Sequence, residues 1–565
     1  MIFTLKTTYM KMHKLMKIDS RLLLILSTLF LSSSIFAETT LYTNVNGYTL
    51  NREREIVQFY AVQFTNDKID RLYLNEQDLP TDPDLIIDGK GQTMIPGLID
   101  AHGHVLTYGL SLLRVDLVGA ESELNAVQRV VDFAKDNEQL DWIQGRGWNQ
   151  VLWESNAFPL ASSLDSAINA KPVWLIRIDG HAGWANSAAM EIAGINSRTE
   201  DPDGGQIIRD ENGDPTGVFI DNAMALVRSG IPPLSFEERK LALLTAMQSL
   251  AKFGLTSVHE AGASSTTIQA YKQLQQVGPL PVRVNVMLAA VDDDFELRLA
   301  EGHFRSSDDT LTLNSVKISA DGALGSRGAS LIDDYSDSSG HTGLLLHSPE
   351  RIQYFMRAAM NAGFQVNTHA IGDNANKLVL DSYEQLIAET NTRDLRHRIE
   401  HAQILRYEDI LRFAELGVIP SMQATHATSD KNMAVDRLGE VRIQGAYAWR
   451  KLLDTGTIIA NGSDFPVESP NPFFGLHAAI TRQDKNNEPP DGWYPEERMT
   501  PAEAFASFTI DAAYAGHQED ILGSLEPGKK ADFIILDRDI FTSANSELWQ
   551  TQVVETWVNG KKFTD

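Results

Sequence analysis

Two histidines two residues apart follow a largely apolar run near the start of the chain. His102 and His104 come directly after residues 94–101, Met-Ile-Pro-Gly-Leu-Ile-Asp-Ala, with one glycine between them. Residues two apart on a β-strand share a face, so both imidazoles would project to the same side. Neutral imidazole is a common ligand of Zn²⁺ and similar cations. The pair by itself is equally compatible with hydrogen-bonded histidines in a protein core, so further candidate ligands are needed to decide.

Four further β-rich runs end at or near a residue that could bind a metal: Lys317, His369, His401 and Asp464. The two histidines would add imidazole ligands to those of the first pair. A carboxylate at Asp464 could bind a cation and also accept a proton from water. The alternative for Asp464 is a capping residue of a following helix.

Lys317 is the unusual member of this set, because an ammonium group repels cations. Burial beside cations lowers the pKa of a lysine, and the neutral amine can then react with CO₂ to form an anionic carbamate. A carbamate could bridge two metal ions. The alternative is a buried lysine paired with an acid such as Asp321, which would leave a site for one ion.

In chain order, the set His-x-His, Lys, His, His and Asp resembles the metal-dependent amidohydrolase superfamily. The resemblance is closest to its YtcJ-like branch, which includes N-substituted formamide deformylases. Shorter motifs extend it over nearly the whole chain after residue 37. They are Gly-Arg-Gly-Trp at 145–148, Asp-Gly-His-Ala at 179–182, Asp-Gly-Ala-Leu-Gly-Ser-Arg at 321–327, Gly-Ser-Asp-Phe-Pro-Val at 462–467 and Gly-Ser-Leu-Glu-Pro-Gly-Lys-Lys-Ala-Asp at 523–532.

The resemblance implies a divalent metal centre of one or two ions, with Zn²⁺ favoured and with a carboxylated Lys317 where two ions are bound. The implied ligands are His102, His104, Lys317, His369, His401 and Asp464. The motifs also suggest substrate contacts from Trp148, His181, Arg327 and His426. A packed aromatic ring or a surface charge explains each of these four equally well.

The β-rich runs also predict the fold. Eight of them alternate with helical stretches, which is typical of an α/β, TIM-like (β/α)₈ barrel, here expected over residues 96–515. The runs are residues 98–103, 255–259, 282–288, 316–320, 365–370, 398–402, 419–424 and 458–463. Chemistry in such barrels takes place at the C-terminal ends of the strands, where the candidate ligands fall.

Two other parts of the chain lie outside this alternation. About 150 residues separate the first two predicted strands, so residues 105–251 are expected to form an inserted subdomain that covers the catalytic face. Residues 38–95 and 516–565 consist of short predicted strands and turns, and neither segment has enough apolar surface to fold alone. We expect the two segments to form one small β-sandwich together.

The first 37 residues have the pattern of a cleavable secretory signal. Basic residues precede a short apolar core at 22–31, and Ala37 lies just before Glu38. The core is shorter than the about 20 residues that span a membrane, although an uncleaved anchor or a buried helix is the alternative. We therefore expect a periplasmic or secreted protein that begins near Glu38 and has no stable membrane anchor.

Charge and cysteine content exclude some classes of partner and site. The net charge is −27 over 565 residues, which argues against nucleic acid as a partner. The chain has no cysteine, and this excludes disulfides and thiolate zinc sites. The expected partner is a small-molecule substrate, and a homo-oligomer is compatible with the sequence.

These features together predict a metal-dependent hydrolase that cuts a non-peptide carbon–nitrogen bond in an amide, N-formyl or cyclic amide group. A metal-activated hydroxide would attack, and Asp464 would move the proton. Deamination or ester hydrolysis at the same centre is an alternative, because one barrel supports many reactions. A periplasmic binding or metal-scavenging protein is an alternative of another class. Product formation at saturating metal distinguishes it from an enzyme.

Overall fold

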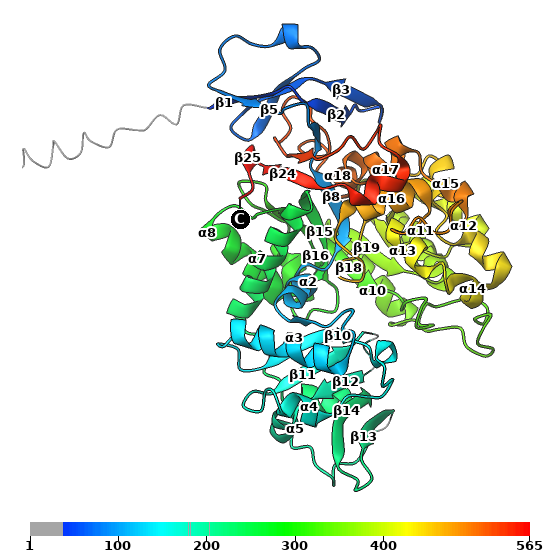
Figure 1. Ribbon diagram of the computed structural model, residues 1–565. Coiled ribbons are helices and arrows are strands. Elements are labelled where there is room, and N and C mark those ends of the chain that lie inside the picture. Colours follow the sequence, from blue (N-terminus) through cyan, green and yellow to red (C-terminus); the bar gives the residue numbers. More distant parts are fainter. Residues whose placement is uncertain (1–37, 179, 181, 203, 565) are drawn as a thin grey trace, which may run out of the picture.

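The computed structural model describes residues 38–178, 180, 182–202 and 204–564 (Figure 1). The predicted signal segment and His181 lie outside the described residues. Eight parallel strands form the central, nearly closed barrel, and the (β/α)₈ prediction is confirmed. In order around the barrel they are β8 (Leu98–Gly103), β15 (Leu255–Ala263), β16 (Arg283–Ala289), β18 (Leu311–Ser319), β19 (Gln365–Ala370), β20 (Arg398–His401), β21 (Ile419–Gln423) and β22 (Ala460–Gly462).

The barrel closes where the last strand meets the first. The amide of Asp464 donates to the carbonyl oxygen of His102 at 2.7 Å. A side chain cannot fit at Gly462, because a Cβ there would lie 2.5 Å from the backbone nitrogen of His102. The Asp100 carboxylate accepts hydrogen bonds from the amide and hydroxyl of Ser463, the latter at 2.6 Å. This close approach holds Asp464 beside His102 at the C-terminal end of the barrel.

Helices surround the strands and pack their apolar faces on them. Several have clear start signals, such as the capping box between Ser235 and Glu238 at the start of α7. The helices after β8 and around the barrel are α2 (Val105–Leu112), α7 (Phe236–Lys252), α8 (Ser265–Val277), α9 (Phe295–Glu301), α10 (Pro349–Asn361), α11 (Asp373–Thr390), α12 (Tyr407–Leu416), α13 (Ala424–Asp430), α14 (Ala434–Arg442), α15 (Trp449–Asp454), α16 (Pro472–Thr481), α17 (Pro501–Ser507) and α18 (Ile510–Ala515). The short strand β17 (Phe304–Arg305) pairs with β18.

A separate six-stranded sheet lies between β8 and β15 in the chain, and Figure 1 shows it as a lobe at one end of the molecule. Its core includes the buried rings of Trp148, Trp153 and Trp184. Its strands, in spatial order, are β13 (Gly205–Arg209), β14 (Pro215–Asp221), β12 (Ala182–Ala185), β11 (Val173–Arg177), β10 (Ile143–Trp148) and β9 (Val115–Asp116). Its helices are α3 (Glu123–Asp136), α4 (Ala161–Asp165), α5 (Ser187–Ile192) and α6 (Met224–Arg228).

Both ends of the chain contribute to the sheets at the opposite end of the molecule (Figure 1). One sheet has the order β5 (Lys68–Tyr73), β4 (Ala61–Thr65), β1 (Thr39–Thr43) and β6 (Leu85–Asp88). The other has the order β25 (Lys561–Lys562), β24 (Val553–Val558), β23 (Phe533–Leu536), β7 (Thr93–Pro96), β2 (Asn46–Leu50) and β3 (Ile56–Phe59). One apolar cluster joins them, so the two chain ends share a core.

The Arg283 guanidinium anchors these sheets to the barrel, because it is fully buried and donates to Asp532 at 2.6 and 3.0 Å. Among the described residues, no helix combines the length and apolar character that crossing a membrane requires.

Candidate metal centre

Three side chains from different strands meet at the C-terminal end of the barrel. His102 lies one residue before the end of β8, His401 ends β20 and Asp464 follows β22, and one ligand atom from each lies within 4.8 Å of the others. All three residues are buried. Two imidazoles and a carboxylate this close together could bind one divalent cation jointly.

The hydrogen bonds behind the imidazoles determine which ring nitrogen faces the cavity. His102 Nδ1 contacts the Glu400 carboxylate and therefore carries the proton. His401 Nδ1 lies 2.6 Å from Oε1 of Gln423, whose amide nitrogen donates to the Ser421 carbonyl at 3.1 Å. The Gln423 oxygen must then be the acceptor. Both histidines keep an Nε2 lone pair for a ligand, and burial, the larger cause, together with the Lys317 charge, lowers the pKa of His102 to about 4.

Arg398 keeps the buried Glu400 carboxylate ionised. The Arg398 guanidinium donates to both Glu400 oxygens at 2.8 Å, and both side chains are almost completely buried. Burial would raise the pKa of Glu400, but Arg398 and His102 hold it well below its usual value. Arg398 also donates to Nδ1 of His259 at 2.9 Å, which explains the buried histidine on β15. The Arg398–Glu400 ion pair thus holds the His102 ring in place through its contact with Nδ1.

Asp464 faces a group of imidazoles. Its Oδ1 lies 3.1 Å from Nε2 of His104, and its Oδ2 lies 3.6 Å from Nε2 of His426 on α13. Burial alone would raise the pKa of Asp464, but His104 and the neighbouring imidazoles hold it well below its usual value. Asp464 also has a left-handed backbone with φ of 61°, which Asp tolerates better than most residues. Asp464 is therefore an ionised carboxylate in this site.

Lys317 points into the same cavity. Its Nζ lies 3.2 Å from Nε2 of His102, and burial lowers the pKa of Lys317 to about 8. Gly262 makes room for it, because a Cβ at that position would lie 3.3 Å from Cγ of Lys317. Pairing with Asp321 does not occur within the described part of the chain. The Asp321 carboxylate instead accepts backbone amides of Ser330, Ile371 and Gly372 at 2.8 to 3.0 Å.

His369 completes the ring of candidate ligands, with its imidazole centroid 4.6 Å from that of His401. The cavity has a volume of about 450 Å³. His104, Lys317, His369, His401, His426 and Asp464 line it together with the polar side chains of Gln403, Ser429, Asp430 and Glu468 and with apolar and small residues. No described residue of the inserted subdomain is part of this lining.

Unsatisfied polar atoms test whether this site suits a metal. Nε2 of His369 and Nε2 of His426 are buried and have no hydrogen-bond partner among the described residues. Buried polar atoms are nearly always paired, so two unpaired imidazole nitrogens beside the Asp464 carboxylate point to a missing ligand. Imidazole nitrogens and a carboxylate oxygen are the donors that a divalent transition metal prefers. The residues present therefore fit such a cation.

Two of the predicted substrate contacts lie elsewhere. Trp148 is fully buried in the core of the inserted sheet, where its Nε1 donates to the Leu175 carbonyl at 2.9 Å. Arg327 donates to the Asp337 carboxylate at 2.9 and 3.0 Å and does not line the cavity. His426 is the predicted contact that the structure brings to the centre.

Sequence reasoning missed Glu400 and Gln423, the residues that orient the imidazoles. The signal for Glu400 was its spacing from Arg398, because two charged residues two apart on one buried strand share a face and pair there. Gln423 at the end of β21 carried no comparable signal.

Residues 85–562 match the model of a protein family described as "Amidohydrolase family". The chain belongs to the amidohydrolase family. It is 36% identical over 490 residues to "Protein LONG AFTER FAR-RED 3" of Arabidopsis thaliana, covering 84% of this chain and 82% of the relative. It is also 27% identical over 494 residues to "N-substituted formamide deformylase" of Arthrobacter pascens, covering 84% of this chain and 89% of the relative.

Among solved amidohydrolase-like structures, an uncharacterized metal-dependent hydrolase from Pyrococcus furiosus superposes with a TM-score of 0.73 at 27% identity. The match covers 89% of this chain and 99% of that chain. Membership of the amidohydrolase family thus agrees with a metal site formed by His102, His401 and Asp464.

We expect His401→Ala to lower metal affinity by at least about ten- to hundredfold, because it removes an oriented imidazole from the centre. Elemental analysis after dialysis measures the bound metal. His303→Ala is the matched control, since His303 is an exposed histidine that does not line the cavity. Wild-type metal content in His401→Ala would exclude His401 as a ligand.

Proposed function

We propose that this amidohydrolase hydrolyses a non-peptide carbon–nitrogen bond in an amide, N-formyl or cyclic amide group of a small molecule. The observation that carries the proposal is Asp464, an ionised and buried carboxylate that faces the imidazoles of His104 and His426 at the cavity. The deformylase name of the Arthrobacter pascens relative supports this substrate class. A cavity of about 450 Å³ suits a small molecule.

His102, His104, His369, His401 and Asp464 would hold the cation, with Lys317 beside them. A divalent cation in such a site supplies Lewis-acid chemistry, which polarises a carbonyl and acidifies water. Asp464 accepts the proton of the attacking water at a carboxylate oxygen and delivers it to the leaving nitrogen, so that the carbon–nitrogen bond breaks without forming an amide anion. His426, whose Nε2 is unpartnered, contacts the substrate carbonyl oxygen from α13.

The proposal is tested by incubating the metal-loaded protein with a panel of N-formyl, N-acyl and cyclic amide compounds. The expected result is release of amine and carboxylate in equal amounts. Ammonia from amino-heterocycles in place of amines would instead identify a deaminase, and turnover restricted to esters would identify an esterase. Binding of metal and amide without any product would support a binding protein and contradict the proposal.

We also propose that the Lys317 amine is carboxylated. Its neutral nitrogen forms a bond to the carbon of CO₂ and gives up a proton to water, and the oxygens of the resulting carbamate would help to hold one or two cations. The position of Nζ, 3.2 Å from Nε2 of His102, supports this state, because an unmodified ammonium would donate into the lone pair that a ligand histidine needs.

We expect Lys317→Ala to lower kcat/KM by about 10²-fold and to lose one metal equivalent. A short carboxylic acid such as acetate is expected to restore part of both. A carbamate carbon signal in the NMR spectrum of protein exposed to labelled bicarbonate, absent from Lys317→Ala, gives a second measurement. Full metal content and activity in the variant would contradict carboxylation.

We further propose that the protein is exported and that its mature form begins near Glu38, on the signal pattern of the first 37 residues. N-terminal sequencing of protein from the periplasmic fraction is expected to start at or next to Glu38. Recovery from the cytoplasm with Met1 intact would contradict this expectation.

A further inference from the structure

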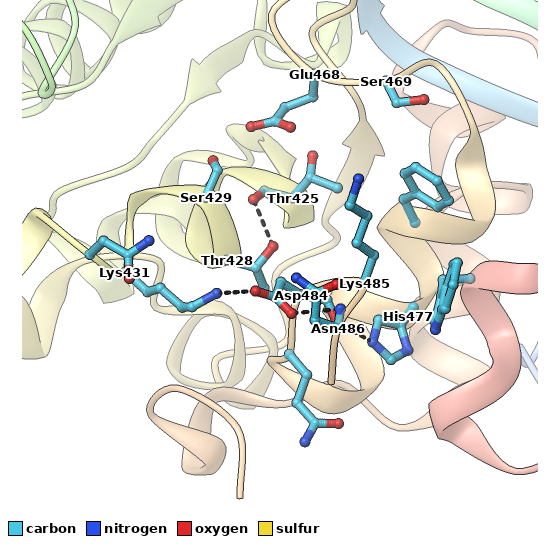
Figure 2. A pocket seen from close by; sticks show the side chains of 14 residues that line it. Thr425, Thr428, Ser429, Lys431, Glu468, Ser469, His477, Asp484, Lys485 and Asn486 are labelled. Carbon is cyan, nitrogen blue, oxygen red and sulfur yellow. Dashed lines mark hydrogen bonds and ion pairs between the residues drawn. The ribbon is translucent and has the colours of Figure 1, made fainter. Parts of the chain in front are cut away.

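A second hollow of about 340 Å³ adjoins the cavity of the metal centre, and Figure 2 shows the side chains that line it. Ser429 and Glu468 line both spaces. The two hollows are therefore neighbours that meet at these two residues.

Helix α13 contributes side chains to both spaces. His426, Ser429 and Asp430 line the metal cavity, and Thr425 and Thr428 line the second hollow. Residues three or four apart lie on one face of a helix, so α13 presents one face to each space. The helix that brings His426 to Asp464 thus also forms a wall of the neighbouring hollow.

The second hollow contains hydrogen-bond donors without partners. Within the described part of the chain, the Lys485 ammonium forms no ion pair or hydrogen bond, whereas nearby Lys431 is paired with Asp484 at 2.6 Å. In Figure 2 the Lys485 side chain extends toward the loop that carries Glu468 and Ser469. The Trp549 indole nitrogen and the Thr425 hydroxyl are buried and also lack partners among the described residues.

These donors define the ligand. A buried donor without a partner is costly, so the oxygens of an anion would satisfy the buried indole N–H and hydroxyl. The ammonium of the exposed Lys485, which lines the same space, would attract that anion. Phe474 and Trp549 supply aromatic walls that suit an alkyl or aryl chain. A dianion such as a phosphate ester is disfavoured, because the carboxylates of Glu468 and Asp484 line the same hollow. A single carboxylate on an apolar chain fits best.

We propose that the second hollow is a subsite for the far end of the substrate, and that this end carries a carboxylate bound by Lys485. This inference rests on the proposed amide hydrolysis at the metal centre. The substrate class is then an amide whose scissile bond lies near Asp464 and whose chain passes Ser429 and Glu468 to a terminal carboxylate. Lys485 acts as a specificity residue that touches the substrate and takes no part in bond cleavage.

The test compares two amides of equal length, N-formyl-aminocaproate and N-formylhexylamine, of which only the first has a terminal carboxylate. If the enzyme turns over another acyl group and not the formyl group, that acyl group replaces the formyl group in both compounds. We expect wild-type protein to prefer the carboxylate member in kcat/KM. Lys485→Ala is expected to lower this preference by about ten- to hundredfold, mainly through KM, and Lys485→Arg to retain most of it. Lys135→Ala is the control for overall charge, since Lys135 is an exposed lysine of the inserted lobe.

Direct binding gives a readout that does not depend on turnover. Titration with phenylbutyrate and with its uncharged counterpart phenylbutanol is expected to show tighter binding of the acid to wild-type protein and loss of that difference in Lys485→Ala. Trp549→Phe, which removes the indole N–H and keeps a ring, is expected to weaken binding of the acid several-fold. Lys485 is exposed, so its substitution leaves the fold intact.

The outcomes separate the two proposals. If amides are hydrolysed but Lys485→Ala keeps the wild-type preference, the subsite is overturned and the proposed function stands. The subsite is equally overturned if phenylbutyrate binds Lys485→Ala as tightly as wild-type protein, because the acid is then held by the metal centre alone. If no amide is hydrolysed but binding of phenylbutyrate depends on Lys485, the proposed function fails and the anion site stands.

Discussion

Replacing Asp464 by Asn is expected to lower kcat for amide hydrolysis by about 10²- to 10⁴-fold, because an amide cannot accept the proton of the attacking water. Asn is the appropriate substitute for two reasons. It has the same shape as Asp, and it tolerates the left-handed backbone that Asp464 adopts at φ of 61°. The variant is therefore expected to fold normally, and a lost rate reports on the carboxylate itself.

Turnover of Asp464→Asn is measured at saturating metal, with bound metal determined on the same sample. A low rate at full metal occupancy assigns Asp464 to proton transfer, and a low rate with empty sites assigns it chiefly to metal binding. Asp132→Asn is the control, since the Asp132 side chain is 60% exposed on the inserted lobe. Wild-type kcat in Asp464→Asn would contradict both roles.

Replacing Arg398 by Met is expected to destabilise the fold by about 3 to 5 kcal/mol, because the substitution leaves the Glu400 carboxylate buried and unpaired. Arg398 also donates to the Ala101 carbonyl at 2.7 Å and to the Ser421 hydroxyl at 2.8 Å. One guanidinium therefore connects β8, β20 and β21 beneath the metal centre. Urea denaturation measures the loss. Arg357→Met is the control, since the exposed Arg357–Glu389 pair should contribute at most about 1 kcal/mol.

The Arg398–Glu400 ion pair makes the difference in stability between wild-type protein and Arg398→Met depend on pH. Arg398 and His102 hold the pKa of Glu400 in the folded protein well below its ordinary value of 4.5, although burial opposes them. A carboxyl group with a lowered folded pKa contributes its full stability above the unfolded pKa and loses it as the pH falls below that value. The gap between wild-type protein and Arg398→Met is therefore expected to narrow as the pH falls, because protonation relieves the buried, unpaired Glu400 of the variant above pH 4.5 and removes the wild-type stabilisation below it. A gap that stays constant into acid would show that packing, and not charge, is what Arg398 contributes.

The sequence by itself determines the barrel. β-rich runs that alternate with helical stretches indicate parallel strands, and the runs at 98–103 and 365–370 predict β8 and β19 with the bounds that the structure has. The last strand is shorter than predicted, Ala460–Gly462 in place of 458–463, because the chain turns beside His102 immediately after Gly462. The candidate ligands could also be predicted, since parallel strands of one barrel bring their C-terminal ends to one face.

Only the tertiary structure decided how the candidate metal ligands are held in place and which of the predicted substrate contacts lie beside them. His102 is oriented by Glu400, 298 residues away in the chain, and a contact of that kind leaves no periodic signal. Local motifs likewise do not reveal where a side chain points. Arg327 pairs with Asp337, and Trp148 lies in the core of the inserted sheet. His426, by contrast, lies beside Asp464. The second hollow arises from packing α13 against residues 483–486 and Trp549, and no single segment of the chain contains it.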